Sequence, residues 1–231
     1  MVKVLQKIVF YTLTFPIAGY VLGGLSQLAR LTCLFKVEGM ENFPNESGKI
    51  MLVSNHPSMT ETFILPGLFF RHYVFRPKHG PWVLAGSNLW RSPIYFLPMC
   101  VAWGRVITVL RKQKRKERSF GRATPAFDPA VKVLEDGGNI FFFPEGGRTW
   151  KREKEGKTIL FSAIKGRKLA KLRRGVALLA SQPGVTLVPV WVEWSTRTIT
   201  VGEPHTFTDV PQKEIISRIE QIFLELADKV A

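Results

Sequence analysis

The sequence predicts an α/β fold: a single layered domain with a central mixed sheet flanked by helices, preceded by an N-terminal membrane-anchoring helical segment. Short apolar runs that suit buried strands alternate along the chain with segments of helical periodicity. The 231 residues, 45% hydrophobic and 22% charged, suffice for one domain with a sizeable core and exclude a disordered chain. A 22-residue stretch without a charged side chain lies near the N-terminus.

Five strands and four helices are expected in order along the chain. The strands are runs of apolar and β-branched residues at 49–54, 105–110, 139–143, 186–193 and 197–201. The helices are expected at 59–70, 125–136, 169–181 and 211–230. The second of these ends at a Gly-Gly pair, and the last shows an Ile, Phe and Leu periodicity typical of an amphipathic helix.

The apolar stretch over residues 8–29 is long enough to span a bilayer core. Pro16 lies near its middle and three glycines follow, so a broken helix or a shallow helical hairpin fits the sequence as well as one straight span. Basic residues on both flanks suit a re-entrant anchor with both ends in the cytosol, and no cleavage pattern of a signal peptide follows. We expect residues 1–34 to anchor the chain and residues 35–231 to form the α/β domain.

The net charge of +15 is concentrated in two runs. Residues 111–118 hold six basic residues and one acidic residue, and residues 151–174 hold ten basic and two acidic residues, so these runs carry thirteen of the fifteen net charges. A dense negative surface is the expected partner, and anionic lipid competes with nucleic acid for that role. The basic runs lack interleaved aromatic residues and a nucleic-acid-binding signature, so no nucleic acid is expected. A solvated charged loop is the remaining alternative.

The two cysteines, Cys33 and Cys100, lie far apart in the chain and fit no metal-ligand spacing. A reduced chain that faces the cytosol is the simplest interpretation. Three of the four histidines, His72, His79 and His205, are expected to be structural.

The segment 55–61, Asn-His-Pro-Ser-Met-Thr-Glu, puts a potential base five residues before a carboxylate. Pro57 disfavours the α region for His56, so His56 should end the strand over 49–54, with a helix starting soon after. Five residues of regular helix turn about 140° past alignment, so His56 and Glu61 can meet only across a tight turn. Glu61 could then fix the imidazole tautomer while the other ring nitrogen takes a proton from a hydroxyl. A structural role for His56 is the alternative.

The segment 143–149, Phe-Pro-Glu-Gly-Gly-Arg-Thr, closes the strand expected over 139–143. A polar turn at the end of a buried strand is where open α/β sheets bind ligands. Arg148 offers a planar fork that suits a phosphate, and Gly146 and Gly147 let backbone amides approach an anion closely. The alternative is an ordinary glycine turn with a surface ion pair between Glu145 and Arg148.

In this order, the two segments resemble the glycerolipid acyltransferase family that includes 1-acylglycerol-3-phosphate acyltransferase. Its members carry N-H-x-x-x-x-D, a G-x-x-F-x-x-R-like segment, F-P-E-G-T-R-S and an apolar strand around V-P-V. Residues 104–111 occupy the second place, residues 187–190 supply the fourth, and residues 172–177 look like the F-K-x-G-A stretch between the third and the fourth. The resemblance spans about residues 35–195.

Three residues depart from the family pattern. Glu61 stands where Asp is usual, which adds one methylene, about 1.5 Å of reach, and keeps the charge. Arg111 falls one residue later than the usual spacing. Gly147 replaces a Thr and removes a hydroxyl, which bears on the acceptor preference.

The resemblance implies a membrane-bound enzyme that moves a fatty acyl group from acyl-CoA or acyl carrier protein to the hydroxyl of a lysophospholipid. The first acceptor to expect is 1-acylglycerol-3-phosphate, which would give phosphatidate. His56 would be the base and Glu61 its orienting carboxylate, with neither a metal nor a bound cofactor. Membrane lipids would be its partners, at the cytoplasmic face of the inner or cell membrane. The acceptor-binding residues would be Glu145, Gly146, Gly147, Arg148 and Arg111.

Two alternatives remain open at this point. Glu61, Gly147 and the basic insertion at 151–171 leave room for another lysolipid or polar lipid head group as the acceptor. From a different class, the chain could be a non-catalytic binder of anionic membranes that keeps the fold. The intact base and carboxylate argue against this second alternative.

Overall fold

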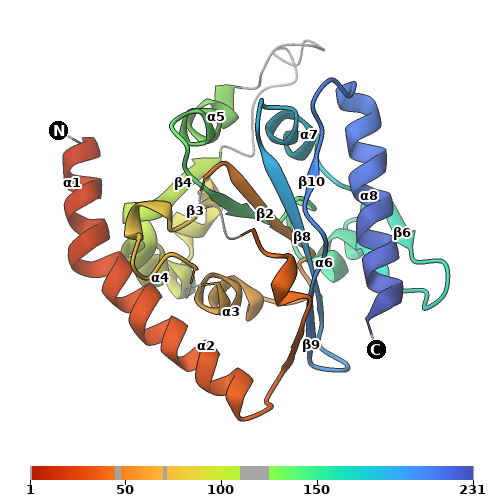
Figure 1. Ribbon diagram of the computed structural model, residues 1–231, viewed down its shortest axis with the longest axis horizontal. Coiled ribbons are helices and arrows are strands. Elements are labelled where there is room, and N and C mark those ends of the chain that lie inside the picture. Colours follow the sequence, from red (N-terminus) through yellow and green to blue (C-terminus); the bar gives the residue numbers. More distant parts are fainter. Residues whose placement is uncertain (1, 45–47, 70–71, 110–124, 231) are drawn as a thin grey trace.

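The computed structural model describes residues 2–44, 48–69, 72–109 and 125–230, and a single mixed sheet forms its centre (Figure 1). In spatial order the strands are β1 (Lys36–Glu38), β9 (Thr198–Val201), β8 (Thr186–Glu193), β2 (Ile50–Ser54), β5 (Ile140–Phe142), β3 (Trp82–Gly86) and β4 (Val106–Val109). A short strand, β10 (His205–Thr206), pairs with the start of β8. The pairings of β8 with β9 and β10 are antiparallel and all others in this sheet are parallel, so the predicted mixed sheet is confirmed.

Helices and short turns connect these strands. The α-helices are α3 (Glu61–Leu68), α4 (Pro93–Ala102), α5 (Asp128–Glu135), α6 (Thr149–Lys154), α7 (Gly175–Ala180) and α8 (Gln212–Lys229). Short 3-10 turns lie at Met40–Asn42, Pro77–His79, Ser87–Arg91, Trp103–Arg105 and Pro125–Phe127. A separate two-stranded hairpin, β6 (Ile159–Phe161) with β7 (Lys168–Ala170), follows α6.

The sheet is buried on both faces, and alternate residues of β2 show how. Met51 and Val53 face the core beneath α5, α7 and α8, whereas Ile50 and Leu52 face the core beneath α3. Helices cover both sides of the sheet accordingly, with α5, α7 and α8 on one side and α3 on the other (Figure 1). A parallel strand buried on both faces reads as a continuous apolar run, which is why residues 50–53 show no polar alternation.

All five predicted strands are present, and three of the four predicted helices agree with α3, α5 and α8 to within three residues at each end. The prediction of one helix over 169–181 is wrong in its first part, because residues 168–170 form β7 and only α7 is helical. Two strongly apolar elements, β3 and α4, were not predicted. Both are nearly uniform in hydrophobicity, so they lack the periodicity that separates helix from strand.

The N-terminal segment is one continuous helix from Val2 to Leu31, made of α1 (Val2–Val9), a π-helical stretch η1 (Phe10–Val21) and α2 (Leu22–Leu31). The helical hairpin considered from the sequence is therefore wrong. Pro16 lies inside the π-helical stretch, where its missing N–H is accommodated by altered hydrogen bonding instead of a reversal of the chain. Among the described residues, Val4–Leu31 is the one helix long and apolar enough to cross a membrane.

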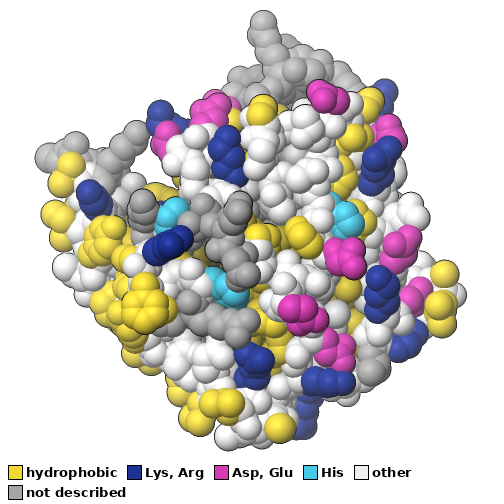
Figure 2. All heavy atoms as spheres, in the orientation of Figure 1, with side chains coloured by type: hydrophobic (Ala, Val, Ile, Leu, Met, Phe, Trp, Pro, Cys, Tyr) yellow, Lys and Arg dark blue, Asp and Glu magenta, His cyan; other side chains and the backbone are white. Residues whose placement is uncertain are grey.

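Two glycines allow this helix to lie against the domain. A Cβ on Gly67 of α3 would come within 2.6 Å of the Ser26 Oγ, and one on Gly104 would come within 2.6 Å of the Phe10 Cα. The inner face of the helix, including Phe10 and Phe15, is thus buried on the domain. Only 29% of its most apolar window is buried, and hydrophobic side chains gather along its outer side (Figure 2). The exposed apolar residues of that side include Val4, Leu5, Ile8, Tyr11, Tyr20, Leu25, Leu28 and Leu31.

Candidate active site

The first site segment leaves the sheet at the carboxyl end of β2, between β8 and β5. Asn55 continues the pairing with β8 through its side chain: Nδ2 donates to the Val192 carbonyl at 3.0 Å, and the Val192 N–H donates to Oδ1 at 2.7 Å. The chain after β2 is therefore fixed in direction although regular strand pairing has ended. His56 follows directly, where ligands bind in open α/β sheets.

His56 and Glu61 form a close buried pair. The Nδ1 of His56 lies 2.7 Å from the Glu61 Oε1, and the exposed fractions of the two residues are 9% and 0%. Glu61 is the first residue of α3, so the tight turn predicted between base and carboxylate is confirmed. Because Nδ1 is engaged by the carboxylate, Nε2 is the ring nitrogen left to receive a proton from a substrate.

Three further donors hold the Glu61 carboxylate. The Ser58 N–H donates to Oε1 at 2.9 Å, the Ser58 hydroxyl donates to Oε2 at 2.6 Å, and the indole N–H of Trp194 donates to Oε2 at 3.3 Å. Burial alone would raise the pKa of Glu61, but the hydrogen bonds from His56 and Ser58 outweigh it and hold that pKa below its ordinary value of 4.5. The carboxylate is therefore ionised at neutral pH and accepts a hydrogen bond from the Nδ1–H of His56.

The imidazole is also oriented by a ring. Phe143, directly after β5, stacks on His56 with 3.9 Å between ring centroids and 12° between planes. Since β2 and β5 are parallel neighbours, with Val53 opposite Phe142, the residues that follow both strands meet at the same sheet edge. This register is what brings the two segments together, as the sequence order suggested.

Glu145 joins the two segments through its buried carboxylate. Oε1 accepts the backbone N–H of His56 at 2.7 Å, and Oε2 accepts the Thr149 hydroxyl at 2.8 Å and the Ala170 N–H at 2.9 Å. The Thr149 N–H also donates to the His56 carbonyl at 2.9 Å. Burial raises the pKa of Glu145 to about 7, against the opposite effect of these hydrogen bonds.

Two expectations for Glu145 are corrected by this geometry. The residue is fully buried, so it does not form a surface ion pair with Arg148. Both oxygens are engaged by protein donors, so a direct contact with an acceptor phosphate is also wrong. Glu145 instead holds the backbone of His56 against the Gly-Gly-Arg turn.

The turn at Gly146 and Gly147 is surrounded by arginines. Gly146 has φ +73°, a conformation that favours glycine, and a Cβ there would lie 3.1 Å from the Arg173 Cγ. A Cβ on Gly147 would lie 3.2 Å from the Arg152 Cδ. Arg148 is partly exposed at the start of α6, with its guanidinium 4.8 Å from the ring centre of Trp150. Arg111 lies outside the described residues.

A family model described as Acyltransferase matches residues 34–193, more than two thirds of the chain. The chain belongs to the acyltransferase family. The matched range contains His56, Glu61 and the whole Gly-Gly-Arg turn, and it ends at the last residue of β8.

Two plant proteins are among its relatives. Over 158 residues the chain is 25% identical to the chloroplastic 1-acyl-sn-glycerol-3-phosphate acyltransferase LPAT1 of Arabidopsis thaliana, and 24% identical to the chloroplastic 1-acyl-sn-glycerol-3-phosphate acyltransferase BAT2 of Brassica napus. Each match covers 67% of this chain but only 34% and 36% of the relatives, so the chain spans about a third of their length. These matches support a glycerolipid acyltransferase family.

Several supporting residues of this acyltransferase were not predicted. Ser58 could have been found, because Ser-x-x-Glu at 58–61 has the spacing of a helix capping box, in which the glutamate reaches back to the serine N–H. Trp194 and Ala170 come from distant parts of the chain, and no local pattern marks them. No group of three or more His, Cys, Asp or Glu side chains in the described ranges is arranged to hold a metal ion.

Proposed function

We propose that the protein transfers a fatty acyl group from an acyl thioester to the hydroxyl of a lysophospholipid, with 1-acylglycerol-3-phosphate as the first acceptor and phosphatidate as the product. The donor is acyl-CoA or acyl carrier protein. The observation that carries this proposal is the buried His56–Glu61 pair, with Nδ1 and Oε1 2.7 Å apart, beside a Gly-Gly-Arg turn that suits a phosphate.

In the proposed reaction, His56 Nε2 removes the proton from the acceptor hydroxyl as its oxygen attacks the thioester carbonyl carbon. The ionised Glu61 stabilises the imidazolium that forms. The carbon–sulfur bond then breaks, and the imidazolium returns the proton to the leaving thiolate. Gly146, Gly147 and Arg148 hold the acceptor phosphate, and we keep Arg111 as a further contact. Ester formation from a thioester balances without a metal or a bound cofactor.

The proposal places this reaction at a membrane surface. The outer side of the helix over residues 2–31 is apolar and exposed, and an apolar helix face can bury itself among lipid chains and head groups. The acceptor is itself a lipid, so an anchor of this kind brings base and acceptor into the same layer. Free cysteines and basic flanks favour the cytoplasmic face.

A second acceptor is favoured by one observation. Gly147 lacks the hydroxyl that threonine would supply, and the space beside it is taken by Arg152, whose Cδ would lie 3.2 Å from a Cβ at this position. Another lysolipid head group therefore remains the alternative acceptor within the same reaction class. A non-catalytic membrane binder would have no use for an ionised carboxylate paired to an imidazole.

Purified full-length protein in detergent tests the proposal directly. It should be offered acyl-CoA or acyl carrier protein with a panel of lysolipids that differ in head group, and the lipid products should be identified by mass. Phosphatidate formed from 1-acylglycerol-3-phosphate is the expected result. If no lysolipid is acylated with either donor, the proposed function is wrong.

A further inference from the structure

Arg152 is a buried guanidinium beside the Gly-Gly turn. It lies on α6, one helical turn after Arg148, and the residue is 8% exposed. Its Nη1 donates to the Glu155 Oε2 at 3.0 Å, and the Glu155 side chain is 43% exposed. Its buried Nε has no hydrogen-bond partner among the described residues.

This arrangement leaves a buried cation only partly compensated. Its carboxylate partner among the described residues, Glu155, is partly exposed, so its attraction is screened by water, and a buried N–H without an acceptor is costly. Native structures avoid such groups unless an unseen partner or a functional use accounts for them. An anion that accepts from Nε would satisfy both the orphan donor and the charge.

Gly147 packs directly against the Arg152 side chain. The position that a Cβ on Gly147 would occupy is 3.2 Å from the Arg152 Cδ, the atom to which Nε is bonded. With glycine there, no side chain separates the backbone amides of the turn from the Arg152 side chain. An anion bound at the turn would therefore lie beside the Arg152 side chain.

We propose that Arg152 is a second guanidinium of the acceptor head-group site, which binds a phosphate monoester oxygen through Nε across Gly147. This inference rests on the proposed function and names the class of its acceptor. A monoester has three terminal oxygens and close to two negative charges, enough for Arg148 and Arg152 to bind different oxygens. A phosphodiester has one charge and carries a substituent where the third oxygen would be.

Binding of glycerol 3-phosphate to the full-length protein, measured by titration calorimetry in detergent, tests the role of Arg152 apart from turnover. Arg152→Gln should weaken binding about tenfold or more, and Arg152→Lys should restore only part of it. Lys151→Gln, an exposed cation on the same helix, is the matched control and should bind within about twofold of the unmodified protein. If Arg152→Gln binds glycerol 3-phosphate as the unmodified protein does, or if that protein does not bind it, the inference fails.

Two further variants separate ligand binding from support of α6. Glu155→Gln removes the ion pair but leaves the guanidinium, so binding should persist; a loss equal to that of Arg152→Gln would mean a purely structural role and overturn the inference. Gly147→Ala keeps the charge and places a methyl group 3.2 Å from the Arg152 Cδ, so it should displace the Arg152 side chain and weaken binding without lowering the melting temperature by more than a few degrees. Unchanged binding in Gly147→Ala would also overturn the inference, even if Arg152→Gln fails to fold.

The acceptor kinetics distinguish this inference from the proposed function. Arg152→Gln should raise the KM for 1-acylglycerol-3-phosphate more than the KM for the acyl donor. If the enzyme makes phosphatidate and this KM does not change, Arg152 is excluded and the function stands. If no lysolipid is acylated but Arg152→Gln still weakens glycerol 3-phosphate binding, the function is excluded and the anion site stands.

Discussion

Glu61 serves two neighbours with a single oxygen. Its Oε1 accepts both from the Nδ1 of His56 and from the N–H of Ser58, while Oε2 accepts from the Ser58 hydroxyl and from Trp194. The same carboxylate thus holds the Ser58 turn before α3 and the imidazole of His56. An aspartate is about 1.5 Å shorter and could not keep all of these contacts with the same backbone. The longer side chain is therefore matched to this turn.

Substitutions of Glu61 should separate the effect of its charge on activity from the effect of its side-chain length. Glu61→Gln should lose roughly 10²- to 10⁴-fold in kcat, because an amide neither stabilises the imidazolium nor holds the required tautomer. Glu61→Asp keeps the charge and should lose roughly ten- to a hundredfold through misplacement of the base. Initial rates at saturating acceptor would show whether kcat decreases in the order unmodified enzyme, Glu61→Asp, Glu61→Gln. A Glu61→Gln variant as active as the unmodified enzyme would exclude the carboxylate from the mechanism.

The pairing of His56 with Glu61 could be predicted from the sequence because its parts are local. His56 and Glu61 lie on either side of one turn, and Pro57 marks where the strand ends. The role of Glu145 could not be predicted, because it depends on burial and on the distant Ala170 N–H. Local spacing shows which groups are polar, but it does not show which of them are enclosed.

At the scale of elements, Glu145 joins four of them. Its oxygens accept from the residues that follow β2, from the first residue of α6 and from the last residue of β7, and it follows β5 itself. A protonated Glu145 also finds partners, because it can donate to the Thr149 hydroxyl, which lies 3.5 Å from the His56 carbonyl. Both protonation states are therefore structurally possible at this joint.

The raised pKa of Glu145 predicts a pH dependence of stability. In the unfolded chain the carboxyl ionises near its ordinary pKa of 4.5, whereas in the folded protein its pKa is about 7. Between these values the folded state binds more protons, so this group lowers the free energy of unfolding as pH rises through that window. Glu145→Gln lacks the effect. The stability of the unmodified protein relative to Glu145→Gln should fall from pH 5 to pH 7 and level off above it.

Urea unfolding of both proteins at several pH values would measure this difference. A difference that stays constant or increases from pH 5 to pH 8 would show that Glu145 is already ionised throughout. Because Glu145→Gln is the reference for the unmodified protein, the contributions of all other titrating groups cancel to first order.

Helices and strands could be predicted where apolar residues lie on one face or where a polar motif marks the end of the element. The helix α8 has one apolar face, and the strands β2 and β5 end in recognisable polar segments. The hairpin of β6 and β7 was missed because strands of three residues are too short to show a period. Yet β7 supplies the N–H that Glu145 accepts, so even a strand of three residues matters to the site.

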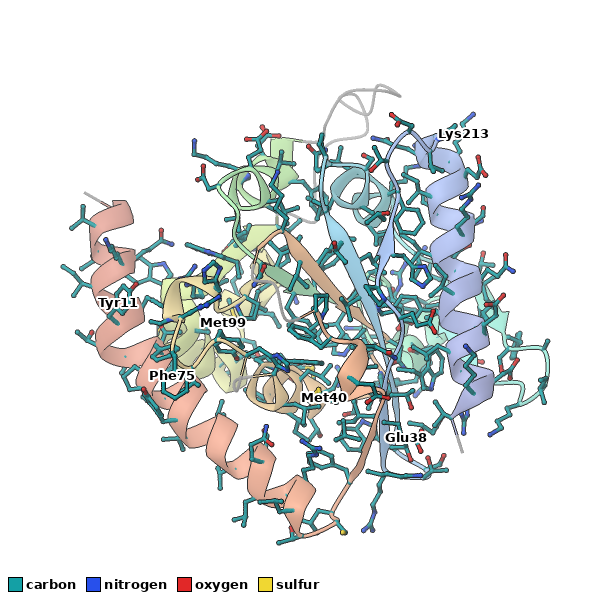
Figure 3. The ribbon with its side chains drawn as sticks, viewed as in Figure 1. Tyr11, Glu38, Met40, Phe75, Met99 and Lys213 are labelled. Atoms are coloured by element: carbon teal, nitrogen blue, oxygen red, sulfur yellow. The ribbon has the colours of Figure 1, made fainter. Side chains whose placement is uncertain are left out.

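At the scale of the whole molecule, the N-terminal helix and α8 lie at opposite edges (Figure 1). Tyr11 on η1 and Lys213 at the start of α8 lie at opposite edges of the molecule (Figure 3). The outer side of the N-terminal helix faces away from the sheet, and its inner side contacts α3 and α4. One flat membrane could therefore contact the helix along its length and leave α8 in water.

Substitution on the outer face tests the anchor without removing the helix. Leu25 and Leu28 are each 57% exposed, so Leu25→Gln with Leu28→Gln should leave the melting temperature nearly unchanged. Each leucine contributes roughly 2 kcal/mol when moved from water into lipid, so flotation with vesicles at high salt should fall strongly. The basic side chains should retain some binding to anionic vesicles, and this remaining binding should weaken as the salt concentration rises.

Ile164→Gln is the matched control, because Ile164 is 82% exposed on the hairpin between β6 and β7. This variant should float as the unmodified protein does. If the double leucine variant floats equally well at high salt, the helix face is not the anchor. Deleting residues 1–34 would be a poorer test, because Phe10 and Phe15 pack into the domain core.

The central claim is that His56, oriented by Glu61, activates a lysophospholipid hydroxyl for acyl transfer. The most direct measurement is phosphatidate formation from 1-acylglycerol-3-phosphate by the full-length enzyme and by His56→Ala, followed by product mass. The account predicts a loss of about 10²-fold or more in kcat with an unchanged fold by circular dichroism. A folded His56→Ala protein that makes phosphatidate at a near-normal rate would contradict it.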